Sequence, residues 1–339
     1  MEEGDLVVHY EYGLAKFRGI QQGDDGEGEE WKHADDAPNG DDDFLFDPFD
    51  NAEWMPVRDP VPGRAKEAMW RKFDIGELAT LFLLETRLVG RSEELTFDEL
   101  FMAPDAERPA IATALKAKIA DPQRTLMGAE QEAWLAQELK TSAASGKKWQ
   151  VLGNQVTMAK VKMPDLQKLL PADKYAQVSQ GAKRFYSTAR WGLEWNLDAW
   201  AGFPAARERL YASAKAANAR LITLTGDTHT SWANELHDAS GQKRGVEFGC
   251  TSVTSNGAGD NVPFEELNWM MPEANDEVLY YNAFSKGFTL LTLKADQVEA
   301  EFVKVAKSYS QRQGISYATW REVGVEASVL KAAGISRSR

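Results

Sequence analysis

The sequence has few of the residues that most often carry chemistry by themselves. It contains one cysteine, Cys250, and four histidines among its 339 residues. A single thiol excludes an intrachain disulfide and any metal site built from several cysteines. No Gly-x-Ser-x-Gly motif occurs, which argues against the nucleophile elbow of a serine hydrolase. The candidates for histidine-dependent chemistry are therefore few.

Long apolar runs are also missing. No run reaches about 18 apolar residues, so a membrane span is not expected. The first residues lack the basic region and the apolar core of a secretion signal. If the natural protein is exported, we expect its signal to lie outside this chain.

Basic side chains are scarce near the N-terminus. Residues 1–53 hold 17 of the 52 acidic side chains and three of the 39 basic ones, so the remainder of the chain is close to neutral. Such a segment repels phosphates, which argues against a broad nucleic-acid surface there. Residues 21–50 are rich in Gly, Asp, Glu and Pro, which predicts a solvated acidic loop. The carboxylates could also bind calcium, although they lack the regular spacing of a calcium-binding loop.

Helix and strand signals alternate after this segment. Apolar runs predict buried strands, helical spacing with good helix formers predicts helices, and two alternating runs around Lys294-Ala295-Asp296 predict an antiparallel hairpin. Helix followed by buried strand occurs twice, which is typical of an α/β sheet with helices on its faces. The expected strands are 78–87, 147–159 with a break at Gly153, and the run from Leu221. The expected helices are 128–146 and 204–219, and the hairpin is 287–305.

The strand beginning at Leu221 ends in an unusual polar cluster. The stretch reads LITLTGDTHTSWANEL, and Asp227 and His229 lie two residues apart. On an extended backbone both side chains would point the same way, where a carboxylate and an imidazole could hold a metal. The alternative is a simple turn at Gly226-Asp227, with His229 capping a neighbouring helix.

Two other strand ends carry polar side chains. Asn154 follows WQVLG, where its amide could bind a metal or a phosphate, or could satisfy the backbone of its own loop. Arg87 follows LATLFLL, where its guanidinium could bind a phosphate or form a structural salt bridge. In open α/β folds ligands gather at the carboxyl ends of strands, so both residues are candidates for the site.

Several stretches resemble the alkaline phosphatase D (PhoD-like) family of metallophosphoesterases. The motif LITLTGDTHTSWANEL is similar to the family's strand, Gly-Asp-x-His and Ala-x-Glu-Leu pattern. Other stretches follow the family's order between about Trp54 and Val305. They are EWMPVR (Glu53–Arg58), LATLFLLETRLVGR (Leu78–Arg91), MGAEQEAWLAQEL (Met127–Leu139), WQVLGNQVTMA (Trp149–Ala159), LDAWAGFPAARERL (Leu197–Leu210) and EFGCTSVTSNG (Glu247–Gly257).

This resemblance implies a two-sheet α/β sandwich with flanking helices and a metal site at its strand ends. It also implies hydrolysis of phosphomonoesters and phosphodiesters by a metal-activated water, with iron and calcium or another divalent pair as cofactors. On the family pattern Asp227 and His229 are catalytic metal ligands. Arg87 and Asn154 are then candidates for binding a phosphate-ester small molecule.

The sequence departs from the family in its N-terminal half. LVVHYEYG (Leu6–Gly13) resembles a family motif that has lost its Gly-Asp-Tyr-Ile portion, and no Asp-Asp-His-Glu motif occurs. The family's first strand and its cysteine are absent as well. We therefore expect a core that is incomplete at its N-terminus, with an exposed sheet edge that favours homo-oligomers.

The expected organisation is an acidic segment (1–53), a phosphatase core (54–310) and a C-terminal extension (311–339). Two hypotheses for function remain open at this point. One is an active metal-dependent phosphatase, and the other is a truncated, catalytically impaired homologue that binds or assembles. Carboxylates of the acidic segment, Asp35, Asp36 and 41–43, could also complete the metal site. The family resemblance further implies an extracytoplasmic location.

Overall fold

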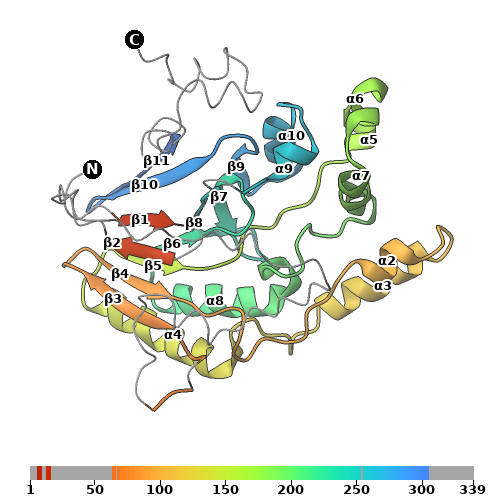
Figure 1. Cartoon of the computed structure of the whole chain (residues 1–339). Coiled ribbons are helices and arrows are strands. Elements are labelled where there is room, and N and C mark those ends of the chain that lie inside the picture. The colour runs from red at the N-terminus through yellow and green to blue at the C-terminus, as the bar shows by residue number, and fades with distance from the viewer. Residues whose placement is uncertain (1–5, 10–12, 17–62, 66, 253–254, 305–339) are drawn as a thin grey trace, which may run out of the picture.

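The computed structural model describes residues 6–9, 13–16, 63–65, 67–252 and 255–304, which form two sheets with helices outside them (Figure 1). The larger sheet has the order β3-β4-β5-β6-β8-β7-β9, and the smaller has the order β11-β10-β1-β2. The larger sheet consists of β3 (Arg71–Ile75), β4 (Ala79–Leu83), β5 (Trp149–Gly153), β6 (Leu221–Thr225), β7 (Ser231–His237), β8 (Lys243–Gly249) and β9 (Val278–Asn282). The smaller consists of β1 (Leu6–His9), β2 (Gly13–Lys16), β10 (Gly287–Leu293) and β11 (Val298–Lys304).

The centre of the larger sheet is parallel. Strands β4, β5, β6 and β8 run in one direction, while β3, β7 and β9 pair antiparallel to their neighbours. All five residues of β6 are buried, as expected for a strand covered on both faces. The predicted strands at 78–87, 147–159 and from Leu221 are confirmed as β4, β5 and β6. Strands β4 and β5 are shorter than predicted, and β6 covers the five residues LITLT.

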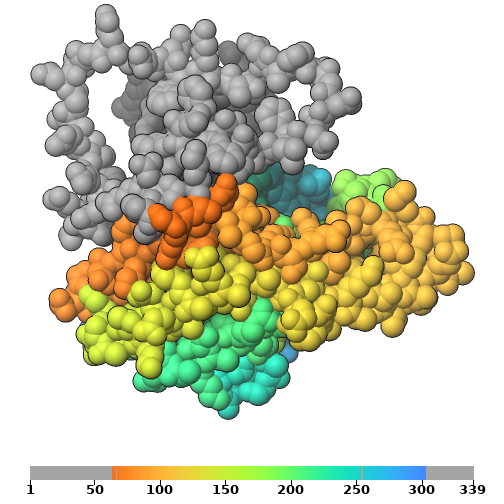
Figure 2. Space-filling model, turned by 90° about the horizontal axis from the view of Figure 1, so that it is seen from below, coloured from red at the N-terminus to blue at the C-terminus, as the bar shows by residue number. Residues whose placement is uncertain are grey.

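Two long helices cover one face of this sheet. The predicted helices are confirmed as α4 (Gly128–Ala144) and α8 (Pro204–Ala216), which pack against each other and against the sheet. Figure 2 shows the outer surface of this layer, with the yellow residues of α4 beside the green residues of α8. Helix α8 begins at Pro204, whose fixed φ suits a first helical position.

The smaller sheet covers the other face. The predicted hairpin is confirmed, because β10 and β11 pair antiparallel from Gly287↔Lys304 to Leu293↔Val298. Leu291 of β10 packs with Val151, Ile222 and Leu224 of the larger sheet. The alternating helix and strand signals predicted helices on both faces of the sheet, but one face is covered by a second sheet, whose strand β10 buries alternate residues. The two-sheet sandwich implied by the family resemblance is confirmed.

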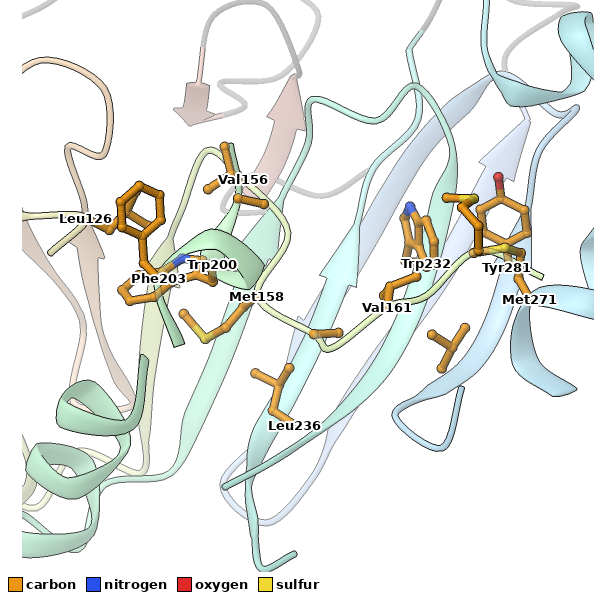
Figure 3. Close-up of a cluster of buried hydrophobic side chains, with 14 of the residues drawn as sticks. Leu126, Val156, Met158, Val161, Trp200, Phe203, Trp232, Leu236, Met271 and Tyr281 are labelled. Atoms are coloured by element: carbon orange, nitrogen blue, oxygen red, sulfur yellow. The ribbon is translucent and has the colours of Figure 1, made fainter. Parts of the chain in front are cut away.

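A broad apolar cluster fills the space between the larger sheet and the long connection after β5. Trp200 and Phe203 lie near Val156 and Met158 in Figure 3, and Trp232 lies near Tyr281. The rings of Trp232 and Tyr281, which face each other across β7 and β9, have centroids 4.4 Å apart. This packing holds the connection after β5 firmly against the sheet.

The remaining helices lie on the connections between strands. They are α2 (Asp98–Met102), α3 (Arg108–Ile119), α5 (Leu166–Leu169), α6 (Ala172–Gln177), α7 (Gln180–Tyr186), α9 (Ala258–Asn261) and α10 (Leu267–Ala274), with short 3₁₀ helices η1 (Ser187–Trp191) and η2 (Trp200–Gly202). Within the described ranges, no helix combines the length and apolarity needed to cross a bilayer. The acidic segment 21–50 and the extension 311–339 lie outside the described residues.

Candidate functional site

The four parallel strands place four loops at one edge of the larger sheet. Strands β4, β5, β6 and β8 are neighbours that all point the same way, so their carboxyl ends meet at one edge. The loops that follow them carry Arg87, Asn154, Asp227 with His229 and, after β8, residues 250–252 and 255–257. The residues predicted from separate strand ends are therefore brought to the same edge of the sheet.

Arg87 connects the first of these loops to the third. Its guanidinium forms an ion pair with Asp198, and its Nη2 lies 3.5 Å from Oδ1 of Asp227. The Arg87 side chain is 35% exposed, so solvent or a ligand can reach it. Burial opposes its charge, but the hydrogen bond to Asp198 and the charges of both aspartates outweigh burial and raise the pKa of Arg87.

Asp198 is shared by two arginines. Arg91 also pairs with the Asp198 carboxylate, and its guanidinium donates to the backbone carbonyls of Asp198 and Thr86, each at 3.1 Å. Asp198 belongs to the stretch LDAWAGFPAARERL, which resembles the family, but the resemblance assigns Asp198 no role. Nothing local in the sequence distinguishes it, because its partners lie more than 100 residues away.

The loop that carries Asp227 and His229 is not extended. Both residues have positive φ, 68° and 54° respectively, and the Thr228 N–H donates to the Gly226 carbonyl at 2.8 Å. The expectation of an extended backbone at these two residues is therefore wrong. A non-glycine residue in the left-handed region costs free energy, and residues held in this way cluster at functional sites.

His229 is held by a backbone contact to the loop after β8. Its Nδ1 lies 2.6 Å from the carbonyl oxygen of Asn256. A carbonyl can only accept, so Nδ1 is the donor in this contact, and in a neutral imidazole the lone pair is then on Nε2. The Thr251 hydroxyl donates to the His229 carbonyl at 2.8 Å, which ties the same two loops together a second time. This is the arrangement that orients metal-binding imidazoles in proteins.

The Asn154 side chain bonds to its own surroundings. It is 5% exposed, donates to the Val156 carbonyl and accepts from Nε1 of Trp200 at 3.2 Å. Of the alternatives that the sequence left open for Asn154, the structure shows the one in which its amide bonds to its own loop. A role of Asn154 toward a metal or a phosphate stays a prediction.

Asp227 and His229 would form only part of a metal site. Across the residues that the structure describes, no group of three or more His, Cys, Asp or Glu side chains is placed to hold a metal ion. The acidic side chains 35, 36 and 41–43 lie outside that part of the chain. Cys250 is buried against the Gly287 carbonyl, with Sγ 3.9 Å from that oxygen, and burial raises the pKa of its thiol.

Comparisons with known proteins identify the family of the chain. The family model of PhoD-like phosphatases matches residues 50–302. Alkaline phosphatase D of Bacillus subtilis (strain 168) is 30% identical over 256 residues, which cover 74% of this chain and 36% of that protein. A solved structure of PhoD is 26% identical, covers 74% of this chain and 41% of its own, and superposes with a TM-score of 0.49. The chain thus spans less than half the length of these relatives. The match over most of the chain nevertheless shows that it belongs to the PhoD-like phosphatase family.

Proposed function

We propose that this chain hydrolyses phosphate esters at the edge formed by the loops after β4, β6 and β8. The observation that carries the proposal is the meeting of Arg87 and Asp227, 3.5 Å apart, from two loops of the parallel sheet. An arginine fork beside a carboxylate and an oriented imidazole can hold a phosphate and a metal together. The family membership of the chain supports the same class of reaction.

The donor set suits a divalent or trivalent metal such as iron, with calcium or a related ion beside it. Because Nδ1–H of His229 donates to the Asn256 carbonyl, Nε2 of the neutral imidazole would be the metal ligand. Asp227 would add a carboxylate oxygen. When bound, the metals would supply an activated water and positive charge for the leaving oxygen. Further His, Cys, Asp or Glu ligands for such a pair would have to come from outside the described residues.

Arg87 would bind the phosphate of the substrate. A guanidinium carries five N–H donors, so it can hold two carboxylates and a phosphate oxygen at the same time. Asp198 and Arg91 fix its position, and the Glu85 carboxylate accepts the backbone N–H of Arg87 at 2.6 Å. Hydrolysis of both monoesters and diesters is part of this proposal.

Removal of either metal ligand tests the proposal. We expect Asp227→Asn and His229→Ala each to lower the hydrolysis of an aryl phosphate by at least about 100-fold, because even supporting residues of metal sites contribute 10–100-fold. Asp276→Asn, an exposed carboxylate, and His237→Ala, a histidine paired with Glu235, are matched controls. Unchanged turnover in both ligand variants would show that the motif is structural.

Metal content provides a second, independent measurement. The full chain is incubated with iron and calcium, freed of unbound ions and assayed by elemental analysis. We expect at least one metal per wild-type chain and a loss of metal in His229→Ala. Less than one metal per wild-type chain, together with no release of phosphate, would favour a binding or assembly module instead.

A further inference from the structure

Lys286 reaches the same edge from the smaller sheet. It lies directly before β10, and its Nζ donates to the Ser252 hydroxyl at 3.1 Å. The contact between Cys250 Sγ and the Gly287 carbonyl places the start of β10 at the end of β8. The second sheet therefore adds one cationic side chain to the strand ends of the first.

Gly257 shows how close this ammonium is to the loop of His229. A Cβ at Gly257 would lie 2.7 Å from the His229 carbonyl oxygen and 3.2 Å from Nζ of Lys286. The residue before it, Asn256, accepts the imidazole N–H of His229. One short turn thus contacts both the backbone and the ring of His229 on one side and approaches the lysine on the other.

The charge of Lys286 is not neutralised by a direct ion pair in the part of the chain that the structure describes. Its hydrogen-bond acceptor, Ser252, is neutral and in turn donates to the Ser255 carbonyl at 2.7 Å. Burial lowers the pKa of Lys286, and the more distant charge of Asp260 opposes this shift. Arg87, by comparison, already faces two carboxylates. A partly buried cation without a paired anion is suited to receive an anionic ligand.

We propose that Lys286 binds a phosphate oxygen of the substrate and favours phosphomonoesters over phosphodiesters. This inference rests on the proposed function, and it adds a residue and a substrate preference that neither the motifs nor the family match assigned. A phosphomonoester carries a charge of about −1.5 to −2 at neutral pH, whereas a diester carries about −1. An added positive charge therefore stabilises the monoester more strongly.

The test compares two substrates on charge variants of the full chain. Lys286→Met removes the charge but keeps a side chain of similar length, and Lys286→Arg keeps the charge. We expect Lys286→Met to raise KM for 4-nitrophenyl phosphate by about tenfold, in keeping with a lost hydrogen bond between charged groups. The KM for bis(4-nitrophenyl) phosphate should rise much less, and Lys286→Arg should retain most of the preference.

Lys294→Met is the matched control, because Lys294 lies at the opposite end of β10 and pairs with Glu299. The inference would be overturned if Lys286→Met changed the KM of both esters equally. It would also be overturned if Lys286→Met had the same KM values as Lys294→Met. If Lys286 had a purely structural role, Lys286→Met would change the KM of both substrates alike and would also lower the melting temperature.

Inorganic phosphate separates failure of this inference from failure of the proposed function. If neither ester is hydrolysed, the proposed function fails, but binding of inorganic phosphate can still be measured by calorimetry. We then expect wild-type chain and Lys286→Arg to bind phosphate and Lys286→Met to bind it about tenfold more weakly. Equal binding by wild type and Lys286→Met, or no binding by wild type, would overturn the role of Lys286.

Discussion

At the scale of single residues, position 257 requires a glycine because there is no room for a side chain, and not because of its backbone conformation. Its φ of −131° is open to any residue, but a Cβ would lie 2.7 Å from the His229 carbonyl, a contact that cannot be tolerated. The turn can approach His229 only because no side chain stands between them. Gly257 therefore sets the distance between the loops after β6 and β8.

We expect Gly257→Ala to lower the free energy of unfolding by about 1–3 kcal/mol, as overpacking typically does, and to reduce kcat/KM by moving His229. Gly181→Ala is the control, because a Cβ there meets nothing within 4 Å and Gly181 lies in α7. Urea unfolding and aryl phosphate turnover are measured on both variants. If Gly257→Ala and Gly181→Ala were equally stable and equally active, the close approach of Gly257 to the His229 carbonyl would be contradicted.

Asp198 is the second residue whose role depends on its neighbours. It faces Arg87 and Arg91 together, so Asp198→Asn leaves two guanidinium groups close to one another without their shared carboxylate. We expect Arg87 to move toward Asp227, and KM for a phosphate ester to rise while the fold is kept. The variant Asp105→Asn, whose ion pair with Arg108 is largely exposed, is the control. A KM equal to that of the control would place Arg87 outside the substrate site.

At the scale of elements, buried carboxylates fix the loops that follow the strands. Glu85 is 3% exposed and accepts the backbone N–H groups of Arg87, Leu88 and Val89 at 2.6 to 2.9 Å. Glu247 plays the same part for the connection after β5, where it accepts the N–H groups of Met158 and Ala159. Burial raises the pKa of Glu247, and these N–H groups oppose that shift. Both loops are held by side chains rather than by a sheet ladder.

Glu85→Gln is expected to loosen the loop of Arg87. The glutamine NH₂ group would face backbone N–H groups, so at least one buried donor would lose its acceptor at a cost of about 1–3 kcal/mol. Hydrogen exchange should increase at residues 87–89, and KM for phosphate esters should rise. Glu130→Gln, an exposed side chain of α4, is the matched change. Unaltered exchange at 87–89 would mean that the loop is held by other contacts.

The elements that the sequence predicted are those that local patterns determine. Strands β4, β5 and β6, helices α4 and α8 and the β10–β11 hairpin follow from apolar runs, helical spacing and turn residues. The left-handed turn at Asp227 and His229 could not be predicted, because contacts to Asn256 and Thr251 stabilise it from another loop. Likewise, Lys286 enters the site through the packing of one sheet on the other, which no local pattern encodes.

At the scale of the whole molecule, the smaller sheet joins the two ends of the described chain. Strand β1 lies between β10 and β2, with Leu6 opposite Leu291 and Val7 opposite Leu290. Leu291 in turn packs against the parallel strands of the larger sheet. A short N-terminal strand therefore completes the sheet that positions Lys286 and covers the second face of the core.

Removal of residues 1–16 should destabilise the fold and expose an edge. Without β1 and β2, strand β10 loses the partner on one side, and its unpaired N–H and C=O groups can pair with another chain. We expect the melting temperature to fall by about 5 °C or more, and the truncated chain to sediment as a dimer or larger species at high concentration. Removal of residues 1–5, which precede β1, is the control. A truncated chain that stays monomeric and melts like the control would show that β1 contributes little to the sandwich, and that the edge of β10 is protected by other means.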